Sequence, residues 1–577
     1  MKRSLRRFGP LAPTLCPVLC LVALVLPAAG CKDDPEGDGG TDSATGTGGS
    51  VGEEGVDETA DGTGTSGGLE ELDVTPAPGG MRRLTPTQYV RSVEVILGEA
   101  AAAAANPPPM PQLGHFDSQT AVDEPLTPVD IETYESSSMA IGNAIMNDPS
   151  GLAVVAPCVN LGGDDCYELV ARDLGRLAWR RPVLDEEVTT LVAIANAARE
   201  WGEGDFMSGI KYEVAAILQS PNFLYVVEVG QPTGEGDVRE LDPYELASRM
   251  SFFFVGHTPD ADLLDLAEAG GLSTNGQLEN VAYDLLERPE ARARLAEFYD
   301  ELYRLRDLQT KGKDAVLFPT FSSELAAAMR QETLLLIQNV VFEEEANFLS
   351  IFDASYTFVN DDLAQLYGMD PPAYPWQLVP MPVEQGRAGI LTQPAFLTVF
   401  SHPDINSPTR RGLFVQETLL CNEIQPPPPG VMANAPTPAE GQTLRQWLEQ
   451  VHNAEDSCAG CHSLMDPVGF AFERFSPIGA FRQLDNGLPI DSSGEVAGVG
   501  TFGSAADLAT LVRNDPRTPI CVVRNLYRST LGHEEGPDQF DGLMVLDESF
   551  ASTNFDYKAL MVELTKNPLF RLVDAPK

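Results

Sequence analysis

The stretch Cys458-Ala459-Gly460-Cys461-His462 is the part of the chain on which the interpretation of its fold depends. The spacing C-x-x-C-H is typical of c-type haem attachment, in which two thiols form thioethers with the porphyrin. The adjacent imidazole then occupies one axial position on the iron. We therefore predict that Cys458 and Cys461 bind haem c covalently and that His462 is the proximal iron ligand.

Two other interpretations of the same five residues remain open. Cys458 and Cys461 can form a plain disulfide if the protein is exported, because extracytoplasmic compartments are oxidising. Alternatively, Cys458, Cys461 and His462 can bind zinc, with His452 as the fourth ligand that a structural zinc site requires. A thioredoxin-like redox site is excluded, because no βαβ pattern surrounds the motif.

The second axial position on the iron has several candidates. Met465 follows His462 by three residues, so on a helix it lies on the same side of the haem and cannot easily reach the other face. His452 precedes the motif closely and is a candidate iron ligand. The other candidates are His533, Met432 and Met544, and an open position would favour small-molecule chemistry over simple electron transfer.

The N-terminus resembles a bacterial lipoprotein signal. Residues 1–30 combine a basic start, an apolar segment and small residues directly before Cys31. We predict that Cys31 is lipidated and anchors the protein to a membrane on the extracytoplasmic side. The alternative is an ordinary secretory signal cleaved near Ala29, which would release a secreted protein. No other apolar run is long enough to span a bilayer.

Composition and charge restrict the remaining chain. Residues 31–80 are rich in Gly, Ser, Thr and acidic residues, which bury too little apolar surface to fold, so we predict a disordered linker. The chain has 38 Lys and Arg against 85 Asp and Glu, a formal net charge of −47. A phosphate backbone would be repelled by this charge, and we therefore predict no nucleic-acid partner.

Helix signals dominate after residue 80. Three segments begin with an oxygen-bearing N-cap followed by Pro, namely Thr85-Pro86, Thr127-Pro128 and Asp242-Pro243. Apolar residues recur at helical spacing in two stripes that we interpret as core: Leu295, Phe298, Leu302 and Leu305, then Leu325, Met329, Leu336 and Val340. Strand-like alternation is confined to Tyr356–Val359. We predict a mainly α, multi-module helical protein with long loops.

Several motifs, read in order, carry a resemblance to a known family. They are Arg83-Leu84-Thr85, the segment from Gly175 to Pro182, the segment from Leu218 to Tyr225, the segment from Arg387 to Leu391, the segment from Asp466 to Phe470, and the segment from Cys521 to Gly532. Together they resemble the secreted, cytochrome-like multi-module proteins first catalogued in planctomycetes. The resemblance implies export and a cytochrome c-like module near the C-terminus, and it names neither a substrate nor a redox partner.

The resemblance and the composition together divide the chain into segments. We predict a signal peptide over residues 1–30, the linker over 31–80, helical modules over 81–150, 151–232 and 233–375, a haem c-like module over 385–490, and a C-terminal helical module over 491–577.

Four further cysteines form two predicted disulfides. Residues 458–462 are called the pentad from here on. With Cys31 lipidated and the two thiols of the pentad assigned to haem, the mature chain has an even number of remaining thiols. Cys158 and Cys166 would close a short loop. Cys421 and Cys521 flank the pentad, and their pairing would join the haem c-like module to the last module.

Arginines near these modules have structural and functional interpretations. Arg180 and Arg181 beside Trp179 are interpreted as a structural stack. Arg410 and Arg411 are candidates for holding haem propionates, or for surface ion pairs.

Two functions follow from these observations. The first is an exported, lipid-anchored haem c protein that acts in electron transfer or as part of an oxidoreductase. The second is a haem-free surface binding or scaffold protein with a structural Cys458–Cys461 disulfide. We find no motif of a hydrolase or of a phosphate-binding loop, so hydrolase chemistry has no support.

Overall fold

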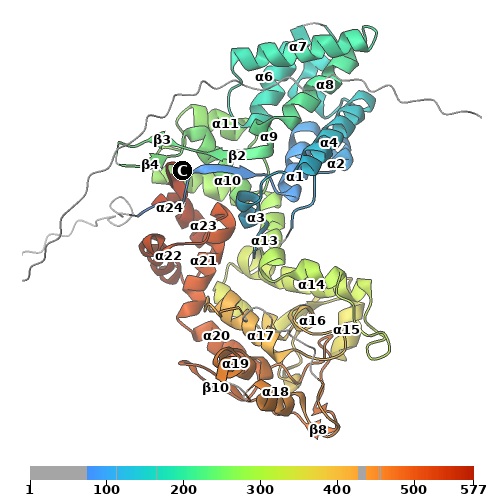
Figure 1. Cartoon of the computed structure of the whole chain (residues 1–577), viewed down its shortest axis with the longest axis vertical. Helices are drawn as coiled ribbons and strands as arrows, with labels where there is room; N and C mark the ends of the chain where they lie inside the picture. The colour runs from blue at the N-terminus through green and yellow to red at the C-terminus, as the bar shows by residue number, and fades with distance from the viewer. Residues whose placement is uncertain are drawn as a thin grey trace, which may run out of the picture. The chain divides into compact units, whose positions relative to one another are not determined.

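The computed structural model describes residues 74–111, 114–163, 165–234, 236–426, 437–452, 454 and 456–576. The predicted signal peptide, Cys31 and most of the predicted linker lie outside these residues. The described residues belong to one compact unit and are mainly helical, with short strands, which confirms the predicted fold class (Figure 1). None of the described helices combines the length and the apolar character that crossing a bilayer requires.

The N-terminal helices share one hydrophobic core. This core is formed by apolar residues between Leu84 and Val226 together with Phe252, and α8 packs against α4, α6 and α7 around it (Figure 1). The predicted first and second modules both contribute to it. The helices of this core are α1 (Pro86–Leu97), α2 (Glu99–Ala104), α4 (Pro128–Asn147), α5 (Leu152–Val155), α6 (Asp165–Trp179), α7 (Asp185–Trp201), α8 (Phe206–Gln219) and α9 (Pro221–Leu224). The short helix α3 (Asp117–Asp123) lies outside it and packs against α21 (Arg517–Leu531).

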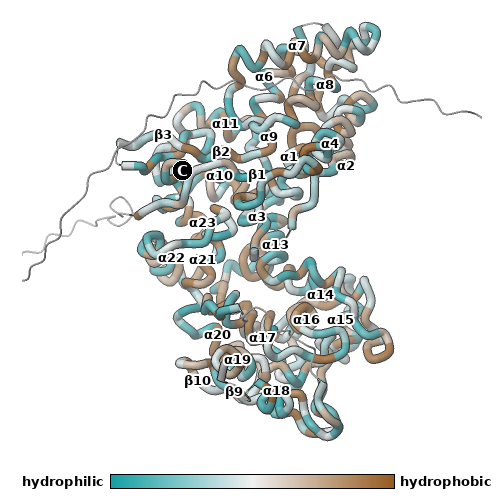
Figure 2. Tube along the Cα trace, viewed as in Figure 1, coloured by the Kyte–Doolittle hydropathy of each residue, from teal (hydrophilic) through white to brown (hydrophobic). Residues whose placement is uncertain are grey.

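Most of the remaining helices surround a second, larger core, formed by residues from α10 to the C-terminus together with Val74, Ala77 and Phe116. Leu444 and Leu448 of α18 form a small separate cluster with Phe470. Both predicted apolar stripes are buried in it. Along these helices, apolar and hydrophilic residues alternate in Figure 2, as expected for helices with one buried face. The helices are α10 (Pro243–Phe254), α11 (Ala261–Glu268), α12 (Asn275–Leu286), α13 (Pro289–Leu302), α14 (Ser323–Gln338), α15 (Asp361–Tyr367), α16 (Pro394–Val399), α17 (Pro408–Phe414), α18 (Leu444–His452), α19 (Asp456–Phe470), α20 (Ala505–Asn514), α21 (Arg517–Leu531), α22 (Phe540–Ser552), α23 (Tyr557–Lys566) and α24 (Pro568–Arg571).

The predicted helix starts are confirmed at all three positions. Thr85, Thr127 and Asp242 are the N-caps of α1, α4 and α10, and each is followed by Pro in the first turn. In each case the N-cap side chain accepts a hydrogen bond from the third helical residue, whose own side chain bonds back to the cap. This reciprocal pairing satisfies two main-chain N–H groups that the helix itself leaves free.

The strands are short and pair antiparallel within the described residues. The predicted strand Tyr356–Val359 is β5, and it pairs with β6. The strands are β1 (Gly80–Arg83), β2 (Tyr225–Glu228), β3 (Gln231–Pro232), β4 (Val238–Glu240), β5 (Tyr356–Val359), β6 (Gln377–Pro380), β7 (Leu484–Asp485), β8 (Leu488–Pro489), β9 (Gly494–Val496), β10 (Gly500–Phe502) and β11 (Leu572–Asp574).

Residues 74–80, the described end of the predicted linker, pack against the rest of the protein. Val74 and Ala77 are buried in the larger core, and the Gly79 N–H donates to the Asp574 carbonyl at 2.8 Å. The apolar residues in this segment gain a core and a strand partner only from the C-terminal end of the chain. Composition alone could not show that pairing.

Both predicted disulfides are present. Cys158–Cys166 closes the short loop before α6, with Cα atoms 5.5 Å apart. Cys421–Cys521 joins the end of the π-helical turn η7 (Val415–Leu419) to α21, again with Cα atoms 5.5 Å apart. The second bridge therefore ties the region that follows α17 to the C-terminal helices.

The arginines beside Trp179 are structural, as predicted. The Arg181 guanidinium lies 5.7 Å from the centre of the Trp179 ring and pairs with Glu187. Arg180 is buried and donates to the main-chain carbonyls of Asn222 and Tyr225. These contacts hold the end of α6 against the segment that leads into β2.

Candidate functional site

Three helices carry the candidate site: α17 and α19, which contribute to the larger core, and α18, whose apolar residues pack with Phe470 of α19. The helices α17 and α19 cross in direct contact at two glycines. A Cβ on Gly412 would stand 1.9 Å from the Met465 carbonyl oxygen, and one on Gly469 would stand 1.9 Å from the Pro408 carbonyl oxygen. Because any larger residue would clash with main chain, both glycines are required for this close approach. The crossing fixes α19, and with it the pentad.

The pentad lies in the first half of α19. Cys458, Cys461 and His462 are spaced i, i+3 and i+4, so they share one face of the helix. Both thiols are partly exposed and unpaired, whereas the four other described cysteines form the two disulfides. Cys458 and Cys461 are therefore not joined by a disulfide in this structure.

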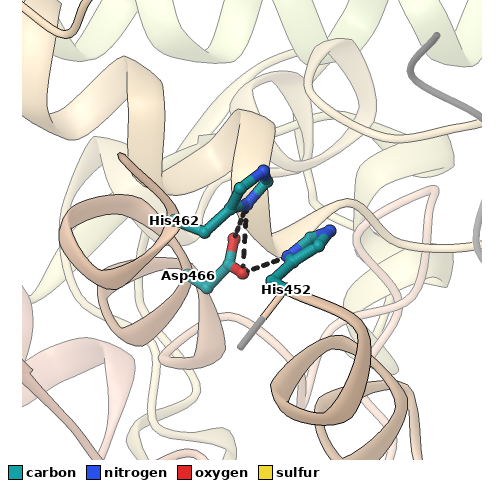
Figure 3. A group of neighbouring side chains, drawn as sticks. All are labelled: His452, His462 and Asp466. Atoms are coloured by element: carbon teal, nitrogen blue, oxygen red, sulfur yellow. Dashed lines mark hydrogen bonds and ion pairs between the residues drawn. The ribbon is translucent and has the colours of Figure 1, made fainter. Parts of the chain in front are cut away.

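One turn after His462, Asp466 accepts hydrogen bonds from both candidate histidines. Its carboxylate lies 2.5 Å from Nδ1 of His452, on α18, and 3.3 Å from Nδ1 of His462. Thr409 Oγ1, on α17, donates to the same carboxylate at 2.6 Å. In Figure 3 both imidazoles direct one nitrogen toward Asp466 and the other away from it. The carboxylate therefore connects all three helices.

The two imidazole rings lie against one another. Their centroids are 3.5 Å apart and their planes are tilted by 33°. Atoms at this separation are in van der Waals contact, so no third planar group fits between the rings. In this arrangement His452 lies on the same side as His462 and does not face it across a macrocycle.

The electrostatics of the carboxylate favour its charged form. The Asp466 side chain is 8% exposed. Burial raises the pKa of this carboxyl, but hydrogen bonds from His452, His462 and Thr409 outweigh burial and bring the pKa below its ordinary value. A buried, ionised acceptor makes shorter and stronger hydrogen bonds to imidazole N–H groups than a neutral carbonyl does.

The residues of the pentad fit a covalently bound haem. The two free thiols and the imidazole share a face, and His462 keeps the nitrogen that points away from Asp466 available for iron.

The histidines and Asp466 also form a potential site for a small metal ion. One ligand atom from each of His452, His462 and Asp466 lies within 4.8 Å of the others. Neither thiol joins this group in the part of the chain that the structure describes, so the predicted zinc set of two cysteines and two histidines is not assembled. Two imidazoles and one carboxylate form the ligand set of several catalytic metal sites.

The other predicted candidates differ in their surroundings. Arg411 is fully buried and donates to the carbonyls of Phe472 and Leu397, so it cannot reach a haem propionate. Arg410 is exposed and stays a candidate. Met465 is buried in α19, His533 follows α21, and Met432 lies outside the described residues.

Sequence reasoning missed Asp466 and Thr409 as parts of the site. Asp466 is four residues after His462, and this spacing on a predicted helix is a signal that could have revealed it. Thr409 could not be found in this way, because its contact with Asp466 spans 57 residues.

Three family models match the chain. In chain order they are PSD5, a protein of unknown function (DUF1595), over residues 166–228; PSD4, a protein of unknown function (DUF1592), over 241–369; and PSCyt3, a protein of unknown function (DUF1588), over 387–485. Their order places the chain among the planctomycete-type multi-module proteins, with a cytochrome-like module near the C-terminus. This confirms the family predicted from the motifs. No curated protein and no solved structure matches the chain.

The cytochrome-like match contains the whole candidate site. Helices α17, α18 and α19 all lie within residues 387–485. A module of this type suggests haem binding. The comparison thus points to the same residues as the pentad and the geometry of α19.

Proposed function

We propose that this chain is an exported, lipid-anchored protein that binds haem c covalently and transfers electrons to or from a redox partner, alone or as part of an oxidoreductase. Cys458 and Cys461 would form the thioethers, and His462 would be the proximal iron ligand. Bound haem would supply a one-electron ferric/ferrous couple. The N-terminal signal features support export, which haem c attachment requires, and Cys31 would carry the lipid anchor.

One observation carries the proposal. Within the cytochrome-like match, α19 presents two unpaired thiols and an imidazole on one face, while the remaining described cysteines are paired. The haem-free scaffold alternative depends on a Cys458–Cys461 disulfide, and these sulfurs are not joined. The chain's own residues also orient the ligand, because Asp466 and the stacked His452 restrict rotation of the His462 ring.

The test is covalent haem content after maturation in a host with working cytochrome c biogenesis. The full chain should give a pyridine haemochrome spectrum and a mass increase of one haem that survives denaturing extraction. Replacing Cys458 and Cys461 with Ser should abolish both signals. The matched control replaces Cys158 and Cys166 with Ser, which removes two cysteines elsewhere and should leave the haem attached. A colourless full-length preparation would overturn the proposal.

A second candidate function is binding of a single divalent transition metal. The clustering of His452, His462 and Asp466 favours it. The same preparations discriminate between the two candidates when they are analysed for bound metal. One zinc or other divalent ion per chain, without covalent haem and lost on His452→Ala, would favour this second candidate. Haem iron that is retained in the His452→Ala variant would favour the first.

A further inference from the structure

We propose that Asp466 is a positioning residue that holds His462 as a strongly basic iron ligand and thereby keeps the midpoint potential of the bound haem low. The inference rests on the proposed function and concerns how this chain's own residues would tune it. Hydrogen bonds from Thr409, His452 and His462 converge on the buried Asp466 carboxylate.

The position of Asp466 determines which nitrogen of His462 is free. Asp466 lies one helical turn beyond His462, and its carboxylate is 3.3 Å from Nδ1 of that histidine. Nδ1 therefore carries the proton that bonds to Asp466, and Nε2 is left to bind iron. A histidine that binds a metal through one ring nitrogen commonly donates a hydrogen bond from the other ring nitrogen. The group that accepts this hydrogen bond sets the orientation and the basicity of the imidazole.

The carboxylate itself is held from two other helices. Thr409 Oγ1 donates to it from α17 at 2.6 Å, and Nδ1 of His452 approaches it from α18 at 2.5 Å. The glycine contacts between α17 and α19 fix the position of Thr409. Because these two hydrogen bonds hold the acceptor from α17 and α18, its hydrogen bond to His462 does not depend on a mobile side chain.

His452 supports the proximal histidine and does not oppose it. Its ring stacks on His462, and it also forms an edge-type pair with the Trp447 ring, with centroids 6.4 Å apart. The stack restricts rotation of the His462 ring about its side-chain bonds. Because the stacked rings leave no space for a planar group between them, His452 would not serve as a second ligand to a haem held by His462 in this arrangement.

The expected consequence concerns the ferric/ferrous couple. An anionic acceptor on Nδ1 draws the proton away from the ring, and the imidazole becomes a more basic donor to iron. A more basic ligand stabilises ferric iron, which carries one more positive charge than ferrous iron, and therefore lowers the midpoint potential. A neutral acceptor at position 466 would have the opposite effect.

The test compares holoprotein variants by spectroelectrochemical titration and by the iron–histidine vibration in resonance Raman spectra. Asp466→Asn should shift the midpoint potential to a more positive value and lower the frequency of the iron–histidine vibration. Thr409→Val should shift both in the same direction by less, because the carboxylate stays but loses one constraint. Asp370→Asn, at an exposed position, is the control and should leave both unchanged.

The outcomes separate this inference from the proposed function. If wild-type protein carries no covalent haem, both proposals fail. If haem is attached and neither Asp466→Asn nor Thr409→Val changes the potential or the vibration, the role of Asp466 is wrong and the proposed function stands. Thr409→Val decides the question if Asp466→Asn does not fold, because it leaves the buried Asp466 carboxylate in place and removes only one hydrogen bond to it.

Discussion

Glu213 offers the sharpest test of the energetics of the N-terminal core. It lies on α8 with 0% of its surface exposed, and neither carboxylate oxygen has a hydrogen-bond partner among the described residues. Burial alone raises its pKa from the ordinary 4.5 to about 9. The Glu213 carboxyl is therefore protonated in the folded protein at neutral pH and ionised in the unfolded chain.

The sign and size of the effect follow from this difference. A raised carboxyl pKa means that the folded state keeps a proton which the unfolded state releases, so stability is greatest below pH 4.5 and falls as pH rises toward 9. At pH 7 the loss is about 3 kcal/mol, since each pKa unit between the ordinary value and the working pH corresponds to about 1.4 kcal/mol. Glu213→Gln cannot ionise and should remove this pH dependence.

The assay must report on this core alone, because a chain with two cores need not unfold in one step. We suggest urea unfolding at pH 5, 6, 7 and 8, followed by pulsed hydrogen exchange of peptides from α8. The midpoint for wild type should fall between pH 5 and pH 8 by an amount equivalent to about 4 kcal/mol relative to Glu213→Gln. Glu200→Gln, on the exposed face of α7, should behave like wild type. Parallel pH profiles for wild type and Glu213→Gln would refute the reasoning.

Two further predictions concern the covalent and steric constraints around the site. Replacing the Cys421–Cys521 bridge with two Ser residues should cost about 5 kcal/mol, against about 3 kcal/mol for Cys158–Cys166, because the closed loops span separations of 100 and 8 residues. Calorimetry of the two variants checks this, and a larger loss for the shorter loop would contradict it. Gly469→Ala should lower both thermal stability and haem content, because its methyl group would overlap an α17 carbonyl oxygen. Gly460→Ala, in the pentad, has no neighbour within 4 Å and should be tolerated; equal losses in both variants would show that the helix crossing is not responsible.

Features that depend on residues close together in sequence were predictable. The caps at Thr85, Thr127 and Asp242 follow from bonds within one helical turn, and the pentad is a local pattern of covalent chemistry. Burial of the apolar stripes follows from helical periodicity, because one face of each helix must be covered. The disulfide partners were predicted from an even number of cysteines, and the structure confirms both pairs.

Other features arise from contacts between segments that are far apart in sequence, and these contacts cannot be predicted from local sequence patterns. The sequence by itself determined the helical class, the family and the haem-type motif, because each resides in short runs of residues. Only the tertiary structure decided that His452 stacks beside His462, that Thr409 and Asp466 complete the site, and that Arg411 is buried away from it. The physical reason is that these contacts depend on how α17, α18 and α19 approach one another in space; between α17 and α19, main-chain packing at Gly412 and Gly469 sets that distance.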